Sequence, residues 1–142
     1  MNVAVIYATK TKHSKKIAES IANALNVDAL DVRSSPVLSG VDLLYIVGGI
    51  YGGQSLPVLL NYVGTLDGSN IKQAVLITSC ASKKSPQTQV RQRLQQKGIN
   101  VLEEEFLCQG SFLFLSMGHP NKLDLENAAA FALQIRERSK FA

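Results

Sequence analysis

The sequence predicts a doubly wound α/β fold, in which helices cover both faces of a five-stranded parallel sheet. Apolar segments of strand length alternate with amphipathic helical segments along the 142 residues. The segment at residues 43–47 is apolar at every position, as expected of a parallel strand covered on both faces. Alternation of this kind implies right-handed crossovers and a three-layer αβα arrangement. The length suits one domain, which we expect to span residues 1–142.

The expected elements follow one another in strict order. The predicted strands are at residues 3–7, 27–32, 43–47, 74–78 and 101–108. An apolar stripe predicts the first helix, and its members are Ile17, Ala18, Ile21, Ala22 and Leu25. Pro57 stands at a first-turn position of the second helix, where its missing N–H costs nothing.

Turn residues delimit the later elements. Ser85 and Pro86 are expected to open the third helix, which ends at Gly98. The last helix is predicted over residues 124–138. Residues 48–53 and 109–120 are expected to be loops.

Composition narrows the class of protein. A hydrophobic content of 46% with 18% charge is ordinary for a compact soluble protein. No apolar run approaches the roughly 20 residues that span a bilayer, and no signal peptide precedes the first strand, so we expect a cytoplasmic protein without membrane insertion. The net charge is +4, but no aromatic residues are interleaved with the basic ones, which argues against a nucleic-acid partner.

The two cysteines are too few for a disulfide framework. Cys80 and Cys108 each end a predicted strand, and these strands are expected to be neighbours. A redox pair is one interpretation, and two separately packed thiols are the one we favour.

Three loops should meet at one edge of the predicted sheet. In doubly wound sheets, ligands bind beyond the carboxyl ends of the strands, where the strand order reverses. This rule selects the loops after the first, third and fourth predicted strands, at residues 8–13, 48–54 and 79–84.

The first loop has the composition of a phosphate site. Its hydroxyls and lysines precede a helix whose free N–H groups and positive dipole end point at the same turn. Ser14 alone is also explained as a helix cap, but a cap leaves Thr9 and Thr11 unexplained. The Walker and dinucleotide glycine motifs are absent. The predicted phosphate contacts are Thr9, Lys10, Thr11, Lys12, His13 and Ser14.

The second and third loops suit a planar ring. Glycines allow close backbone approach, and the tyrosine among them can stack on a ring, although a tight turn with a surface or core tyrosine is the alternative. The third loop is small and polar, so its backbone can hydrogen-bond a ring edge. The predicted ring contacts are Gly49, Ile50, Tyr51, Gly52 and Gly53, followed by Ser79, Cys80, Ala81 and Ser82.

Together these motifs resemble the flavodoxin-like FMN-binding proteins. The phosphate loop of that family, Ser/Thr-x-Thr-Gly-x-Thr, is matched by Thr9, Thr11 and Ser14, and its Ile-Tyr-x-Gly loop by residues 50–53. Residues 118–128 resemble a segment of small bacterial members. The resemblance covers essentially the whole chain and implies FMN as cofactor and strand order 2-1-3-4-5. Lys12 stands where the family has glycine, so it either adds a phosphate contact or strains the loop.

The resemblance implies a small electron carrier, a monomer or weak dimer, that shuttles electrons between a reductase and an acceptor protein. One alternative is an FMN-dependent oxidoreductase acting on a quinone, porphyrinogen or similar small molecule, with the loop at residues 109–120 lining its pocket. Another is a non-redox binding module that keeps the fold without FMN. No nucleophile–base pair, acid pair or metal-ligand cluster is evident, so no catalytic or metal-binding residue is assigned.

Overall fold

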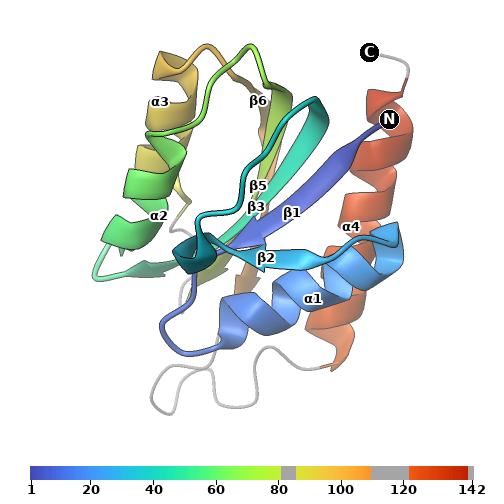
Figure 1. The fold of residues 1–142 in the computed structure, drawn as a ribbon. Helices are drawn as coiled ribbons and strands as arrows, with labels where there is room; N and C mark the ends of the chain where they lie inside the picture. The colour runs from blue at the N-terminus through green and yellow to red at the C-terminus, as the bar shows by residue number, and fades with distance from the viewer. Residues whose placement is uncertain (81–85, 110–121, 141–142) are drawn as a thin grey trace.

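Five parallel strands form the central sheet in the order β2-β1-β3-β5-β6, which is the predicted order 2-1-3-4-5 when these strands are numbered along the chain. The computed structural model describes residues 1–80, 86–109 and 122–140 and confirms the doubly wound α/β fold (Figure 1). The parallel strands are β1 (Val3–Tyr7), β2 (Ala29–Asp31), β3 (Val41–Tyr51), β5 (Ile71–Cys80) and β6 (Asn100–Gln109).

The helices form two layers, one on each face of the sheet (Figure 1). One layer holds α1 (His13–Leu25) and α4 (Lys122–Ser139), and the other holds α2 (Pro57–Val63) and α3 (Thr88–Gln96). None of the helices within the described ranges is both long and apolar enough to cross a membrane.

Side chains alternate between the two cores along each central strand, which explains why these strands are apolar throughout. In β3, for example, Leu43 and Tyr45 pack toward α1 and α4, whereas Leu44 and Ile46 pack toward α2 and α3. Tyr45 is completely buried, and its hydroxyl donates a hydrogen bond of 2.7 Å to the carbonyl of Ala132 in α4.

The connection from β2 to β3 contains no α-helix, unlike the other crossovers between parallel strands. β2 covers only part of the predicted strand at residues 27–32, and the chain then makes a single 3₁₀ turn, η1 (Val32–Ser34). The segment after η1 runs back beside α2, where the hydroxyl of Tyr62 donates to the carbonyl of Pro36 at 2.6 Å.

The prediction of a loop at residues 48–53 is wrong in its first part. β3 continues to Tyr51 and then turns back into a sixth, antiparallel strand, β4 (Gln54–Ser55), which the sequence analysis missed. Gly48 is therefore a strand glycine, needed because a Cβ there would lie 2.7 Å from side-chain atoms of Gln87 and Leu59. Close approach rather than a turn explains this glycine.

The actual turn consists of Gly52 and Gly53, with φ angles of +59° and +79°. Positive φ at both central residues is the requirement of a type I′ hairpin, the turn whose twist suits two-residue connections. The hairpin brings Tyr51 opposite Gln54 and holds it at the end of the sheet.

Replacing Gly53 by alanine should lower the free energy of unfolding by about 1 kcal/mol, because an L residue in the left-handed region is strained. Nothing lies within 4 Å of a Cβ at this position, so the effect is purely conformational. Urea denaturation measures it. Gly53→Asn is the matched control. Asparagine tolerates this conformation, so this variant should lose about half as much free energy of unfolding as the alanine variant. Equal losses in the two variants would contradict the assigned turn.

Candidate functional site

The carboxyl ends of β1, β3 and β5 lie side by side, as the sequence analysis predicts. Tyr7 pairs with Val47, the N–H of Ala8 donates to the carbonyl of Val47 at 3.1 Å, and Gly49 pairs with Ser79. The first loop, the hairpin and the end of β5 are therefore brought together at one edge. The predicted contacts Ala81 and Ser82 lie outside the described residues.

Lys12 provides the turn from the first loop into α1. Its φ of 68° and ψ of 1° are left-handed, and its carbonyl accepts a hydrogen bond from the N–H of Lys16 at 3.2 Å. Lys12 is the N-cap of α1, and no side chain caps the helix. Ser14 lies one residue inside the helix, so the interpretation of Ser14 as a cap is wrong. The first-turn N–H groups thus remain available to a ligand.

Two hydroxyl oxygens of this segment are buried and have no hydrogen-bond partner in the part of the chain that the structure describes. They are Oγ1 of Thr9 and Oγ of Ser14, and Ser14 is completely buried. An unsatisfied buried hydroxyl costs about 1–3 kcal/mol, so native proteins rarely keep one without a reason. A ligand with several acceptor oxygens at the start of α1 would satisfy both. These residues therefore fit a phosphate group.

The other residues of the first loop are more accessible. Lys10, Thr11 and Lys12 are exposed, and Oγ1 of Thr11 lies 2.9 Å from Nδ1 of His13. Burial and the neighbouring charge of Lys16 lower the pKa of His13 below its ordinary value. At neutral pH the imidazole is therefore uncharged and acts as a hydrogen-bonding group rather than as a cation.

Tyr51 joins the hairpin to the first loop. Its phenol folds back over Gly49, where a Cβ would lie 2.5 Å from the hydroxyl oxygen. That hydroxyl accepts a hydrogen bond of 3.4 Å from the N–H of Lys10. The ammonium group of Lys10 lies 5.7 Å from the ring centroid, a cation–π distance. Tyr51 is half-buried, so it is neither a core residue nor a free surface one.

The remaining predicted ring contacts among the described residues lie in the hairpin and at the end of β5. Ile50 is half-buried, Gly52 and Gly53 are exposed, and Ser79 is buried at the end of β5. The backbone of Cys80 pairs with Gln109, whereas Cys108 pairs with Ser79. The two cysteines are therefore not register partners, and the separate packing of their thiols stays a prediction.

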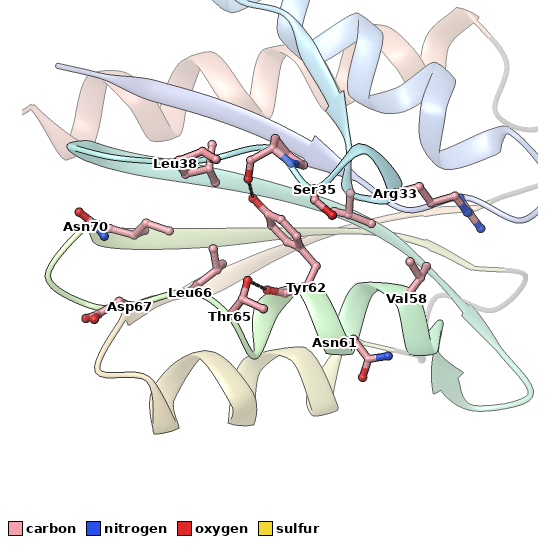
Figure 2. Close-up of a pocket in the computed structure, with 14 residues that line it drawn as sticks. Arg33, Ser35, Leu38, Val58, Asn61, Tyr62, Thr65, Leu66, Asp67 and Asn70 are labelled. Carbon is pink, nitrogen blue, oxygen red and sulfur yellow. Dashed lines mark hydrogen bonds between the residues drawn. The ribbon is translucent and has the colours of Figure 1, made fainter.

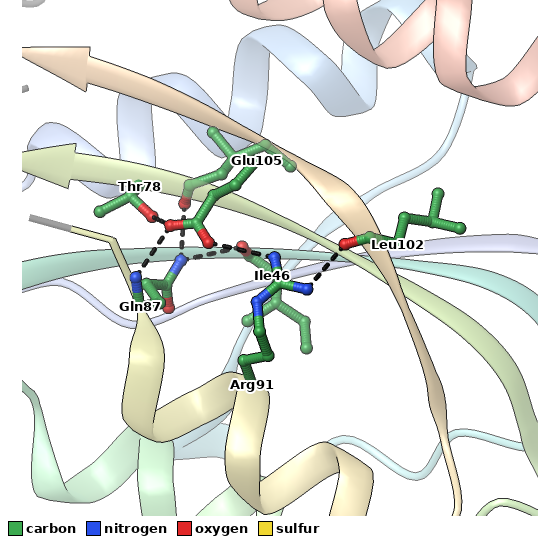
Figure 3. Close-up of polar contacts among 7 residues, drawn as sticks. Ile46, Thr78, Gln87, Arg91, Leu102 and Glu105 are labelled. Carbon is green, nitrogen blue, oxygen red and sulfur yellow. Dashed lines mark hydrogen bonds and ion pairs between the residues drawn. The ribbon is translucent and has the colours of Figure 1, made fainter. Parts of the chain in front are cut away.

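A buried polar network behind the end of β5 was not predicted (Figure 3). Oε2 of Glu105 accepts hydrogen bonds from the hydroxyl of Thr78 at 2.7 Å and from the N–H of Gln87 at 2.8 Å. Oε1 of Glu105 forms an ion pair of 3.3 Å with Arg91, which also donates to the carbonyl of Leu102. The network ties β5 and β6 to the start of α3, and so fixes both ends of the segment that follows β5.

Gln87 extends the network to β3. Its Nε2 donates to the carbonyl of Ile77 at 2.9 Å and lies 3.5 Å from that of Ile46, while its buried Oε1 has no partner. The sequence signal for this network is a run of acidic residues, 103–105, inside the predicted strand at residues 101–108. A charge within a buried strand usually needs a partner on a neighbouring element.

A groove of about 530 Å³ lies apart from these loops (Figure 2). It runs between α2 and the segment after η1, and its lining includes Leu38, Val58 and Tyr62. No residue of the first loop or of the hairpin lines it. The groove is consequently not part of the candidate site.

The match to a protein family agrees with this geometry. The family model of the flavodoxin domain matches residues 4–122. The chain belongs to the flavodoxin family. This flavodoxin-family protein is 29% identical over 136 residues to an uncharacterized protein of Methanocaldococcus jannaschii, covering 87% of this chain and 90% of that one.

Solved structures show the same fold as this flavodoxin-family protein. A flavodoxin from the domain Archaea superposes with a TM-score of 0.73 at 15% identity, covering 99% of each chain. An NAD(P)H:quinone oxidoreductase from Methanothermobacter marburgensis gives a TM-score of 0.68 at 13% identity, covering 95% of this chain and 96% of that one.

Lys12→Gly should raise the free energy of unfolding of the ligand-free flavodoxin-family protein by about 1 kcal/mol. It removes a strained left-handed L residue and a cation at the positive end of a helix dipole. Lys15→Gln removes a charge from the same helix end without changing a left-handed position, so it reports the electrostatic part alone. Equal gains in the two variants, measured by urea denaturation, would show that the conformation of Lys12 costs nothing.

His13 should make the ligand-free protein less stable as the pH falls. Because its pKa is lower in the folded state than the ordinary 6.5, the unfolded chain takes up the proton first and is favoured below about pH 6.5. The stability that depends on uncharged His13 is fully present at neutral pH and is lost as the pH falls. Urea midpoints measured between about pH 7.5 and 5.5 should therefore decline more steeply for the native protein than for His13→Gln. Parallel profiles would contradict the lowered pKa.

Proposed function

We propose that this protein binds FMN and carries electrons between redox partner proteins. The observation that carries the proposal is the pair of buried, unpartnered hydroxyls of Thr9 and Ser14 at an uncapped helix start. Membership of the flavodoxin family supports a flavin as the ligand that fills this site.

The residues of the first loop would hold the phosphate. Thr9 and Ser14 would donate their hydroxyl hydrogens, and the free N–H groups at the start of α1 would add neutral donors. Lys10 and Lys12 would supply charge from the exposed side of the loop. Thr11 and His13, which contact each other, complete the proposed set.

The hairpin and the end of β5 would hold the ring. Tyr51 offers an aromatic face at the end of β3, and its contact with Lys10 couples its position to that of the phosphate loop. Bound FMN supplies reversible electron chemistry, for which no side chain of the protein substitutes. The protein's part is to bind, to orient and to limit the access of water. We assign this part to Gly49, Ile50, Tyr51, Gly52, Gly53, Ser79, Cys80, Ala81 and Ser82.

An FMN-dependent oxidoreductase is the second candidate, because an NAD(P)H:quinone oxidoreductase shares this fold. The two functions separate in a steady-state assay. An enzyme consumes NAD(P)H and a soluble quinone without another protein, whereas a carrier needs a reductase to supply its electrons. Reduction by a photochemical donor, followed by oxidation with an acceptor protein, tests the carrier directly.

The visible spectrum of the purified protein tests the proposal most simply. A protein that binds FMN is yellow, and heat-released flavin identified by chromatography should be FMN. If the protein is colourless and FMN neither co-purifies nor adds to the FMN-free form, the proposal is wrong and the non-redox alternative stands.

Ser14→Ala should weaken FMN binding about tenfold or more, because a hydrogen bond to a charged group contributes about 1.5–3 kcal/mol. It should leave riboflavin affinity unchanged, since riboflavin has no phosphate. The FMN-free protein should be no less stable, because the lost hydroxyl has no partner there. Fluorescence titration and urea denaturation supply these readouts.

Ser20→Ala in the same helix is the matched control. The hydroxyl of Ser20 donates to the carbonyl of Leu125 at 3.0 Å, so its loss should cost about 1 kcal/mol of stability. The ratio of FMN to riboflavin affinity should not change. A Ser14→Ala protein that is destabilised like the control, with an unchanged ratio, would assign Ser14 a purely structural role.

A further inference from the structure

Four lysines form a basic surface around the proposed phosphate loop. Lys10, Lys12, Lys15 and Lys16, here called the lysine face, lie within the first loop and the first turns of α1, and all four are exposed. None of them forms an ion pair with another residue in the described part of the chain. The first turn of α1 contains no acidic residue.

The other cations of the described residues mostly form ion pairs, with Arg93 and Lys97 as the exceptions. Those that form ion pairs with acidic side chains are Arg33, Lys72, Arg91, Lys122, Arg136, Arg138 and Lys140. At the edge opposite the lysine face, for example, Lys72 lies 3.4 Å from Asp42. Among the residues that the structure describes, most of the cations without an ion pair therefore lie at the proposed cofactor edge.

This placement opposes the stability of the fold. Cations at a helix N-terminus face the positive end of the dipole, and Lys12 and Lys16 are like charges four residues apart. A bound phosphate monoester carries only about −1.5 to −2 charges at pH 7, so it leaves about two positive charges without a counterpart. A second anionic group would compensate them.

We propose that the lysine face docks an acidic redox protein, which exchanges electrons with the flavin bound beside it. This proposal rests on the proposed function, and it adds the sign of charge of the partner. Complementary charge steers such partners together and fixes their orientation, and its effect falls as salt is added. Docking here would place the partner's redox centre at the edge that holds Tyr51 and the start of α1.

The composition of the lysine face favours a protein over other polyanions. The aromatic residue beside it, Tyr51, belongs to the proposed ring site, so bound flavin would leave it no free face on which nucleic-acid bases could stack. The exposed large apolar side chains among the described residues are Met1, Val37 and Leu123, and none belongs to the lysine face. A surface that binds lipid normally adds apolar side chains that insert.

Native and succinylated cytochrome c provide a matched pair of acceptor probes. Both carry the same haem, but the native protein is basic and the succinylated one is acidic. The FMN-loaded protein is reduced and mixed with each in a stopped-flow instrument, where every ferric haem takes one electron from the reduced flavin. At low salt the acidic acceptor should react about tenfold faster, and its rate should fall as salt increases. Faster reaction with the basic acceptor would overturn the proposal.

Variants locate the effect on the protein. Lys15→Gln/Lys16→Gln removes two charges of the lysine face without touching the proposed phosphate contacts, and should reduce the salt dependence and the preference for the acidic acceptor at least threefold. Lys72→Gln/Lys97→Gln makes the same change in net charge elsewhere and should leave both unchanged. Equal effects of the two double variants would show that only net charge matters, which also overturns the proposal.

Two further outcomes are distinguishable. If the protein binds no flavin, the proposed function fails, and sedimentation of the two cytochromes with the protein at low salt still tests the charge preference of the lysine face. Retention on duplex DNA or on anionic phospholipid vesicles near 0.15 M salt, together with no preference between the cytochromes, would identify a different polyanion and reject an acidic redox partner.

Discussion

Parallel pairing of β1 and β5 on either side of β3 is the constraint on which the site depends. All three strands run in the same direction, so their carboxyl ends must emerge at the same edge, with Tyr7 opposite Val47 and Gly49 opposite Ser79. Residues separated by many positions in the chain are thereby brought together. The cores on both faces of the sheet stabilise this register, because a slip of one residue would move every side chain of a strand to the opposite face. At the same edge, Glu105 adds a hydrogen bond with Gln87 and an ion pair with Arg91, which hold β6 to the start of α3.

Several unfavourable features meet where the first loop enters α1. Lys12 is left-handed, the hydroxyls of Thr9 and Ser14 are buried without partners, and the lysines of α1 face the positive end of its dipole. Each of these is a local cost, and a sequence selected only for stability would have removed them with a glycine, an alanine and an acidic residue. Local rules broken together are expected at a functional site, so they support the ligand proposed for this turn. The buried hydroxyls need hydrogen-bond acceptors, and the lysines need negative charge. An anion would supply both.

The sequence was sufficient for the fold because the binary pattern is unambiguous. Continuous apolar runs at residues 43–47 and 74–78, separated by amphipathic helices, leave little choice but a parallel sheet covered on both faces. Gly48 and Gly49 predict a turn, but both lie in β3, where a Cβ would be crowded by Gln87 and Leu59 at Gly48 and by Tyr51 at Gly49. The crowding at Gly48 comes from residues distant in sequence, so no local pattern shows it. The ion pair of Glu105 with Arg91 was missed for the same reason, since it joins separate elements.

Lys12 shows how one position can depart from its family without losing the architecture. The loop needs a left-handed residue there, and the family resemblance expects glycine, which adopts that conformation freely. Lysine adopts it at a cost of about 1–2 kcal/mol, small enough for the cores of the sheet to absorb. What lysine adds is an exposed charge beside the proposed phosphate site, aligned with those of Lys15 and Lys16 on the following turn. The proposed docking of an acidic partner would account for keeping a residue that the backbone alone disfavours.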